Sequence, residues 1–199
     1  MTLLTEYPVK LRLAQPPEAR YTDEQFFFFC QANPDLQFER DAEGGIVVMS
    51  PAGMKGSGRN ARITSQLLDW ADRDGTGFVT DSSGAFILPN GATRAPDAAW
   101  TRNDKVEALP DDEFDRFPHI VPGFVIELRS PSDTLADQMA KMEEYRANGV
   151  PLGWLLDPPT RTVRVYRAGE AGVEVIVDPP TMAGEPLLPG FVLDLGGVW

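Results

Sequence analysis

The sequence predicts an α+β domain of mixed α/β character, in which a mixed β-sheet is flanked by helices. Three observations lead to this prediction. Eighteen glycines and eighteen prolines provide the many turns that a sheet-rich chain needs. Short apolar segments suited to strands recur along the chain, while other segments carry apolar residues at helical spacing. Hydrophobic residues make up 42% and charged residues 24%, which is the composition of a globular domain with a buried core.

The length of 199 residues favours one domain. The sequence has no internal repeat, low-complexity tract or Ser/Gly linker that would divide it. We expect residues 1–21 to form an N-terminal lead-in and residues 22–199 to form a single domain.

A helix, a hairpin and a second helix are expected in the N-terminal half. The spacing of Thr22–Gln25 matches a capping box ahead of four phenylalanines, which predicts a short buried helix. Residues 36–40 and 46–49 flank a turn containing two glycines and predict a hairpin, with Glu39 late in its first strand. Apolar residues at helical spacing then predict an amphipathic helix over about 57–74.

Short extended segments are expected from Gly77 to Trp100. Asn90-Gly91 is typical of a tight hairpin turn, and we expect Asp97 on the outgoing strand. Residues 104–122 form an acidic, proline-bracketed connection whose charges are expected to face solvent.

The apolar run 124–129 predicts a central strand. Two-residue alternation places Glu127 and Arg129 on the same face of that strand. Ser130-Pro131 is expected to begin the next helix as N-cap and first helical residue, and Asn148-Gly149 is expected to end it. Further strands and a final edge element are expected at residues 152–156, 162–166, 173–177 and 187–195.

Charge and composition exclude several classes of protein. A formal net charge of −12 argues against a non-specific nucleic-acid coat protein and against a basic binder of membrane surfaces. No apolar run approaches the roughly 18 residues of a membrane span, and we expect a cytoplasmic protein with no membrane partner. Cys30 and His119 are single, which excludes a disulfide framework and Cys/His zinc fingers. Any metal site must therefore use oxygen ligands.

Glu127 is the first candidate site residue, because a carboxylate on a buried strand needs a partner. Two partners stay open. Arg129 would form a purely structural ion pair with it. Alternatively, Asp97 and Glu127 converge on a hard divalent cation such as Mg²⁺, which prefers carboxylates, carbonyl oxygens and waters.

The segments Pro96-Asp97, Glu127-Leu128-Arg129 and Ser130–Asp133, in that order, resemble the PD-(D/E)XK nuclease signature. More narrowly, the chain resembles the Uma-type family of putative restriction endonucleases over about residues 22–199. Further matching segments are Ile46–Gly53, Arg59-Asn60, Asp81–Ala92, Lys141–Tyr145 and Asn148–Pro158. The resemblance implies a restriction-endonuclease-like mixed sheet flanked by helices, with an N-terminal helix and hairpin and C-terminal strands.

The resemblance also implies a metal site. Asp97 and Glu127 would be ligands, the carbonyl of Leu128 a third, and Glu39 would contribute from the first hairpin. The cofactor would be Mg²⁺, with Mn²⁺ as a substitute. A metal held in this way activates water and neutralises the scissile phosphate in phosphodiester hydrolysis.

Arg129 departs from the superfamily pattern, because a lysine is expected at its position. A guanidinium does not deprotonate and cannot be a general base, although it can clamp a phosphate oxygen. Lys141 is then the candidate catalytic lysine, and the alternative is a solvated lysine paired with Glu144 or Asp137. Tyr145, four residues on, either lines the same cleft and contacts nucleic acid or packs half-buried.

Residues 44–68 contain no acidic residue and form a local basic patch in an acidic protein. We expect this patch to contact the phosphate backbone of nucleic acid through Lys55, Arg59, Asn60 and Arg62. The alternative is a flexible surface loop.

The leading hypothesis is a Mg²⁺-dependent endonuclease that hydrolyses phosphodiester bonds in DNA. The alternative is a catalytically inactive nuclease-like module that binds nucleic acid or a protein partner. A structural homo-oligomer is a third hypothesis. A homodimer or higher homo-oligomer is expected, because cutting both strands of a duplex is most simply done by a two-fold pair.

Overall fold

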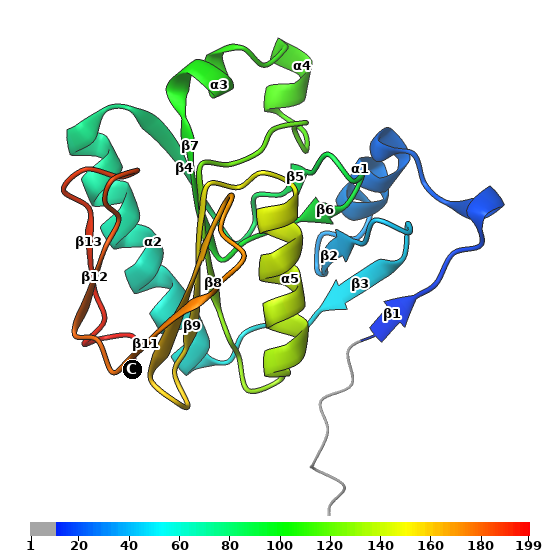
Figure 1. Ribbon diagram of the computed structural model, residues 1–199. Coiled ribbons are helices and arrows are strands. Elements are labelled where there is room, and N and C mark those ends of the chain that lie inside the picture. Colours follow the sequence, from blue (N-terminus) through cyan, green and yellow to red (C-terminus); the bar gives the residue numbers. More distant parts are fainter. Residues whose placement is uncertain (1–10) are drawn as a thin grey trace, which may run out of the picture.

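The computed structural model describes residues 11–199 and contains a large mixed sheet, a smaller antiparallel sheet and a two-stranded ribbon (Figure 1). Residues 1–10 of the predicted lead-in lie outside the described residues. Within the lead-in, strand β1 (Leu11–Leu13) pairs with β3 (Ile46–Met49), and a 3-10 turn covers Pro17–Ala19. The predicted mixed sheet flanked by helices is confirmed, although the strands are divided among three sheets.

The larger sheet has six strands in the order β11-β10-β9-β8-β7-β4. Strands β8 and β9 at its centre run parallel, and the remaining neighbours are antiparallel. The strands span Gly77–Asp81 (β4), Ala98–Arg102 (β7), Phe124–Leu128 (β8), Leu152–Asp157 (β9), Thr162–Arg167 (β10) and Glu174–Val177 (β11). All five residues of β8 are buried, as expected for a central strand.

Two long helices cover opposite faces of this sheet (Figure 1). Helix α2 (Met54–Asp74) packs Ile63, Leu67 and Trp70 against the face that carries Ile126. Helix α5 (Leu135–Ala147) packs Met142 and Tyr145 against the opposite face. The two-residue alternation of β8 therefore gives each face its own core.

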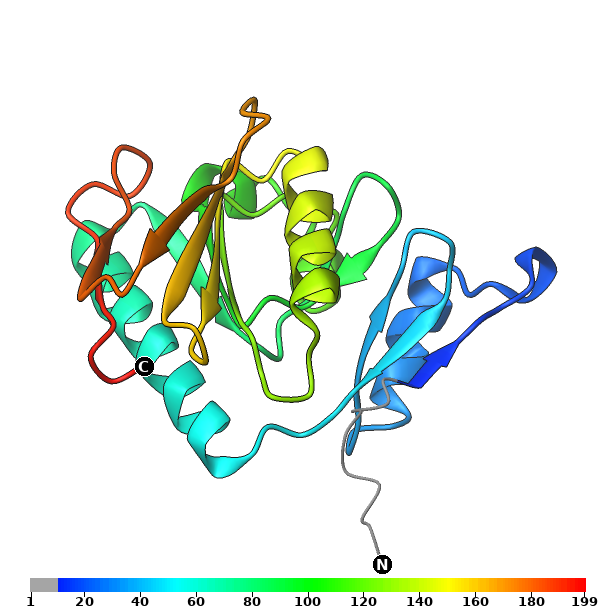
Figure 2. The same cartoon turned by 60° about the horizontal axis from the view of Figure 1, so that its bottom comes forward.

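The smaller sheet has the order β1-β3-β2-β6-β5 and lies beside α5, with helix α1 (Asp23–Gln31) on its far side (Figure 2). Its other strands span Gln37–Arg40 (β2), Ile46–Met49 (β3), Phe86–Ile87 (β5) and Thr93–Arg94 (β6). Both predicted hairpins are confirmed: β2 pairs with β3, and β5 pairs with β6 around Asn90-Gly91.

The N-terminal helix is confirmed with its cap, but it is not buried as predicted. Of its four phenylalanines only Phe26 is buried, and Phe28 is 54% exposed, because the helix packs on the smaller sheet with one side only. The Thr22 hydroxyl accepts from the Gln25 amide, and the Gln25 side chain accepts from the Thr22 amide, which completes the predicted capping box. Helix α2 begins at Met54, three residues before the predicted start, and therefore also includes Gly56.

The predicted N-cap at Ser130 is wrong. Asp133 accepts hydrogen bonds from both the amide and the hydroxyl of Ser130, so residues 130–133 close a turn ahead of the helix. Thr134 is the N-cap of α5, and its hydroxyl accepts from the Asp137 amide. Asn148 and Gly149 end the helix as predicted, with Gly149 at a positive φ of 89°.

The acidic connection contains two short helices, α3 (Asn103–Glu107) and α4 (Asp111–Phe114). The C-terminal tail forms a separate ribbon of β12 (Thr181–Ala183) and β13 (Val192–Asp194). Leu193 of this ribbon joins the core under α2. The final edge element expected at residues 187–195 is therefore not part of the main sheet. No helix among residues 11–199 is long and apolar enough to cross a membrane.

Candidate active site

Three predicted acids reach the site from three separate elements. Glu39 lies on β2, Glu127 on β8, and Asp97 in the bend just before β7, and not on the strand as expected. Glu39 and Glu127 are buried. On β2, Phe38 and Arg40 face α1, so Glu39 points to the opposite side, toward α5.

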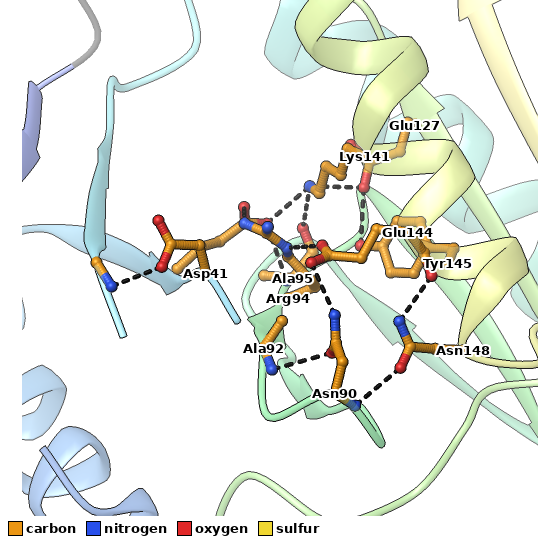
Figure 3. Close-up of polar contacts among 12 residues, drawn as sticks. Asp41, Asn90, Ala92, Arg94, Ala95, Glu127, Lys141, Glu144, Tyr145 and Asn148 are labelled. Atoms are coloured by element: carbon orange, nitrogen blue, oxygen red, sulfur yellow. Dashed lines mark hydrogen bonds and ion pairs between the residues drawn. The ribbon is translucent and has the colours of Figure 1, made fainter. Parts of the chain in front are cut away.

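Lys141 of α5 joins two of these acids (Figure 3). Its Nζ lies 2.7 Å from Oε1 of Glu39 and 2.7 Å from Oε1 of Glu127. The same ammonium donates to the carbonyl of Ala95 at 3.3 Å. The Lys141 side chain is only 11% exposed, so these contacts are made inside the protein. The alternative of a solvated Lys141 paired with Glu144 or Asp137 is therefore wrong.

The alternative of a Glu127–Arg129 ion pair is also wrong. Strand β8 ends at Leu128, so the alternation that would keep the two side chains on one face stops before Arg129. The Nε of Arg129 instead donates to Oδ1 of Asp157 at 2.7 Å, and its Nη1 donates to the carbonyl of Asp133 at 3.3 Å. Asp157 is fully buried and also lies 3.8 Å from Nη1 of Arg164.

Arg94 and Glu144 belong to the same network, although the sequence reasoning missed the first and gave the second another role. Nη1 of Arg94 donates to Oε2 of Glu39 at 3.2 Å, and its Nε donates to Glu144 (Figure 3). The amide of Ala95 donates to Oε1 of Glu39 at 3.0 Å. The signal in the sequence was an arginine three residues after Gly91 of the hairpin turn and two residues before Pro96.

Asp97 is held by two donors. Nδ2 of Asn60 donates to Oδ1 at 2.8 Å, and the amide of Leu128 donates to Oδ2 at 2.7 Å. Leu128 thus contacts the site through its N–H, while its carbonyl remains a predicted ligand.

Tyr145 lies inside the protein, with 1% of its surface exposed. Its hydroxyl donates to Oε1 of Glu127 at 3.0 Å. Tyr145 is therefore more deeply buried than predicted, and a side chain buried in this way is not available for the predicted contact with nucleic acid. Tyr145 instead supports Glu127, one helical turn after Lys141.

The ionisable groups of the site perturb one another. Burial, with the charges of Asp97 and Glu39, raises the pKa of Glu127 to about 8 against the opposing effect of Lys141. Burial also raises the pKa of Asp97. For Glu39, Lys141 and Arg94 outweigh burial and lower the pKa. Burial opposes the charge of Lys141, but Glu127 and Glu39 prevail and raise its pKa. Lys141 is therefore charged, and it lies between Glu39, whose ionised form is favoured, and Glu127, whose raised pKa favours the protonated form more than in a free side chain.

The acidic side chains of the site offer carboxylate oxygens, which are the ligands that a hard cation such as Mg²⁺ prefers. Three of them, Glu39, Asp97 and Glu127, interact electrostatically around a single lysine. In the arrangement of residues 11–199, however, no group of three or more acidic, histidine or cysteine side chains is placed to hold a metal ion. The Lys141 ammonium stands between Glu39 and Glu127.

The predicted basic patch lies on the first turns of α2. Lys55 and Arg62 are exposed and Arg59 is half-buried. Within the described part of the chain, none of these three has an acidic oxygen within 4.0 Å. The predicted flexible loop is instead helix, and Asn60 turns away from the patch toward Asp97.

A solved structure described as a putative nuclease has the same fold as this chain. A crystal structure of a putative nuclease belonging to DUF820 from Anabaena variabilis superposes with a TM-score of 0.71, covering 89% of this chain and 97% of that one. The two sequences are 19% identical, so the similarity concerns the fold. The Uma2 family model, described as putative restriction endonuclease, matches residues 23–196, and the chain belongs to that family. No curated protein matches the chain.

Proposed function

We propose that this chain is a Mg²⁺-dependent endonuclease that hydrolyses phosphodiester bonds in DNA. One observation carries the proposal: Lys141 bridges Glu39 and Glu127, with Asp97 close enough for its charge to raise the pKa of Glu127. Buried acids gathered around a cation are costly to fold and are typical of functional sites. The Uma2 family of putative restriction endonucleases supports the same activity.

Asp97 and Glu127 would hold the metal, with Glu39 and the Leu128 carbonyl as further ligands. When bound, Mg²⁺ or Mn²⁺ lowers the pKa of a water molecule and neutralises charge on the phosphate. Lys141 is protonated in the arrangement described above, so it would contribute positive charge beside the phosphate. Its three N–H groups face Glu39, Glu127 and the Ala95 carbonyl, so one of these contacts would give way before Lys141 donates to a phosphate oxygen. Arg129 is the proposed second phosphate clamp, with Asp157 anchoring its Nε.

The charge distribution favours one direction of approach for DNA. A cavity of about 390 Å³ between the smaller sheet and α5 opens beside Glu39 and Lys141. Acidic residues outnumber basic ones in its lining, which repels a phosphate backbone. The acids of the lining are Glu39, Asp41, Glu43, Asp137 and Glu144. Lys55, Arg59 and Arg62 on α2 therefore offer the proposed path for the strand.

Nicking of supercoiled plasmid tests this proposal. With Mg²⁺ or Mn²⁺, the unaltered chain should nick, while Asp97→Asn, Glu127→Gln and a sample with chelator should not. These variants keep the size of the side chain and remove its charge. Equal nicking in all samples would be contamination and would overturn the proposal.

A second function is a nuclease-like module that binds nucleic acid or a protein partner without cutting. It is favoured by the Lys141 ammonium, which occupies the space between Glu39 and Glu127. Binding of DNA that depends on Lys55 and Arg59, without any nicking, would support this function. We also propose a homodimer or higher homo-oligomer, which sedimentation of the purified chain tests.

A further inference from the structure

Asn60 lies on the buried stripe of α2. Ile63 and Leu67 follow it at three and seven residues, and both are fully buried against the sheet. Lys55 and Arg62 of the same helix are exposed. A polar side chain on the apolar face of a helix needs a partner within the protein.

The partner of Asn60 is Asp97. Nδ2 of Asn60 lies 2.8 Å from Oδ1 of Asp97, while Oδ2 of Asp97 accepts from the Leu128 amide at 2.7 Å. The reversed amide would set its oxygen against the carboxylate oxygen, so the donor must face Asp97. The orientation of the Asp97 carboxylate is thus determined by α2 on one side and β8 on the other.

The amide oxygen of Asn60 is buried and has no hydrogen-bond partner among residues 11–199. In the described part of the chain, the side chain of Asn60 therefore has one polar partner, Asp97, and that partner is a proposed metal ligand. An unsatisfied acceptor beside this carboxylate is ready to receive a hydrogen bond from a water molecule at the site.

We propose that Asn60 is a positioning residue for Asp97, and that it is not a contact to the DNA backbone. This inference rests on the proposed function. The side chain orients the carboxylate for a metal, in the way that residues behind metal ligands usually do, and their loss typically weakens metal affinity 10- to 100-fold. Its neighbour Arg59 has the different task of binding the strand.

The experiment compares Asn60→Leu, which keeps the size of the side chain and removes its donor, with Arg59→Ala. Mn²⁺ titration followed by electron paramagnetic resonance measures metal affinity, and anisotropy of a labelled duplex in chelator measures metal-free DNA affinity. We expect Asn60→Leu to bind Mn²⁺ at least tenfold more weakly with unchanged DNA affinity. Arg59→Ala should show the reverse. In nicking assays, Asn60→Leu should lower kcat and leave KM for DNA unchanged.

Thermal melting checks that each variant is folded. If Asn60→Leu does not fold, Asn60→Ser replaces it, because the serine hydroxyl is too short to take over the hydrogen bond of the amide. Unchanged Mn²⁺ affinity in a folded variant would overturn the inference, and so would a loss of DNA affinity equal to that of Arg59→Ala. If the unaltered chain itself binds no Mn²⁺, the proposed metal-dependent function fails first, and this inference fails with it.

Discussion

The ammonium of Lys141 lies 2.7 Å from the carboxyl of Glu127, and both side chains are buried between α5 and β8. Glu39 shares the same ammonium at 2.7 Å. One buried cation thus faces two carboxyl groups. This arrangement decides how the site responds to mutation and to pH.

Removing the cation should destabilise the protein. Lys141→Met leaves Glu39 and Glu127 without their shared partner, and we expect the free energy of unfolding to fall by about 3–5 kcal/mol. Adding Glu127→Gln should recover part of the loss, with a coupling of about 0.5–3 kcal/mol. Urea unfolding measures both. The matched control is Lys55→Met on the exposed face of α2, which should change stability by less than about 0.5 kcal/mol. Equal effects at the two lysines would contradict the buried bridge.

The pH dependence of stability should show the signature of Glu127. Its pKa rises from 4.5 to about 8 on folding. Between these two pH values the folded chain keeps a proton on Glu127 that the unfolded chain has already lost. The free energy of unfolding should therefore fall as pH rises from about 5 to 8, with a slope from this group of up to about 1.4 kcal/mol per unit. Glu39 has a lowered pKa, and its contribution is lost only on the acidic side of 4.5.

Urea unfolding in chelator at several pH values measures this dependence. In Glu127→Gln the decline between pH 5 and 8 should flatten. Parallel profiles for the variant and the unaltered chain would show that Glu127 is ionised throughout this range.

Tyr145→Phe separates support of Glu127 from contact with DNA. The variant keeps the buried ring and removes the hydroxyl that donates to Glu127. We expect a loss of about 0.5–1.5 kcal/mol in unfolding free energy and no change in the affinity for a labelled duplex. A variant of unchanged stability but several-fold weaker DNA binding would restore the contact with nucleic acid that the sequence suggested.

Removing the buried carboxylate of Asp157 should lower the stability of the protein. It is fully buried and pairs with Arg129, so Asp157→Ala should lower the free energy of unfolding by about 3–5 kcal/mol. Asp178 offers a matched control because it also pairs with an arginine, Arg161, but both side chains are more than half exposed, at 57% and 54%. Asp178→Ala should lose less than about 1 kcal/mol. Urea unfolding of the two variants should rank them in this order, and the reverse order would show that the Asp157 pair is not structurally important.

Much of the local structure follows from short-range patterns. The capping box of Thr22 and Gln25, the Asn90-Gly91 turn and the end of α5 at Gly149 appear where the sequence predicts them. Caps and turns depend on hydrogen bonds and backbone angles within a few residues, so neighbouring residues are enough to specify them. Ser130 was misassigned because Asp133 and Thr134 offer competing local hydrogen bonds.

The sequence indicated which residues of the candidate site come together more fully than it indicated how they pair. A carboxylate on an apolar strand indicated that Glu127 needs a cation, and the resemblance to a nuclease family pointed to Glu39, Asp97 and Lys141. The pairing of Lys141 with two acids, the recruitment of Arg94 and the turning of Asn60 toward Asp97 were not predicted. Only the stripe from Asn60 through Ile63 and Leu67 indicated that Asn60 faces inward.

Short-range patterns in the sequence specify most of the helices and strands and the burial of Glu127, because periodicity and capping act over a few residues. The burial of Glu39, Lys141 and Asp157, and the partner that each of them meets, follow only from the packing of the whole chain. A two-residue or 3.6-residue period specifies the face of a strand or helix and not the element that packs on it. When β2, β8 and α5 pack together, Glu39, Glu127 and Lys141 meet because a desolvated charge is tolerated only beside its opposite.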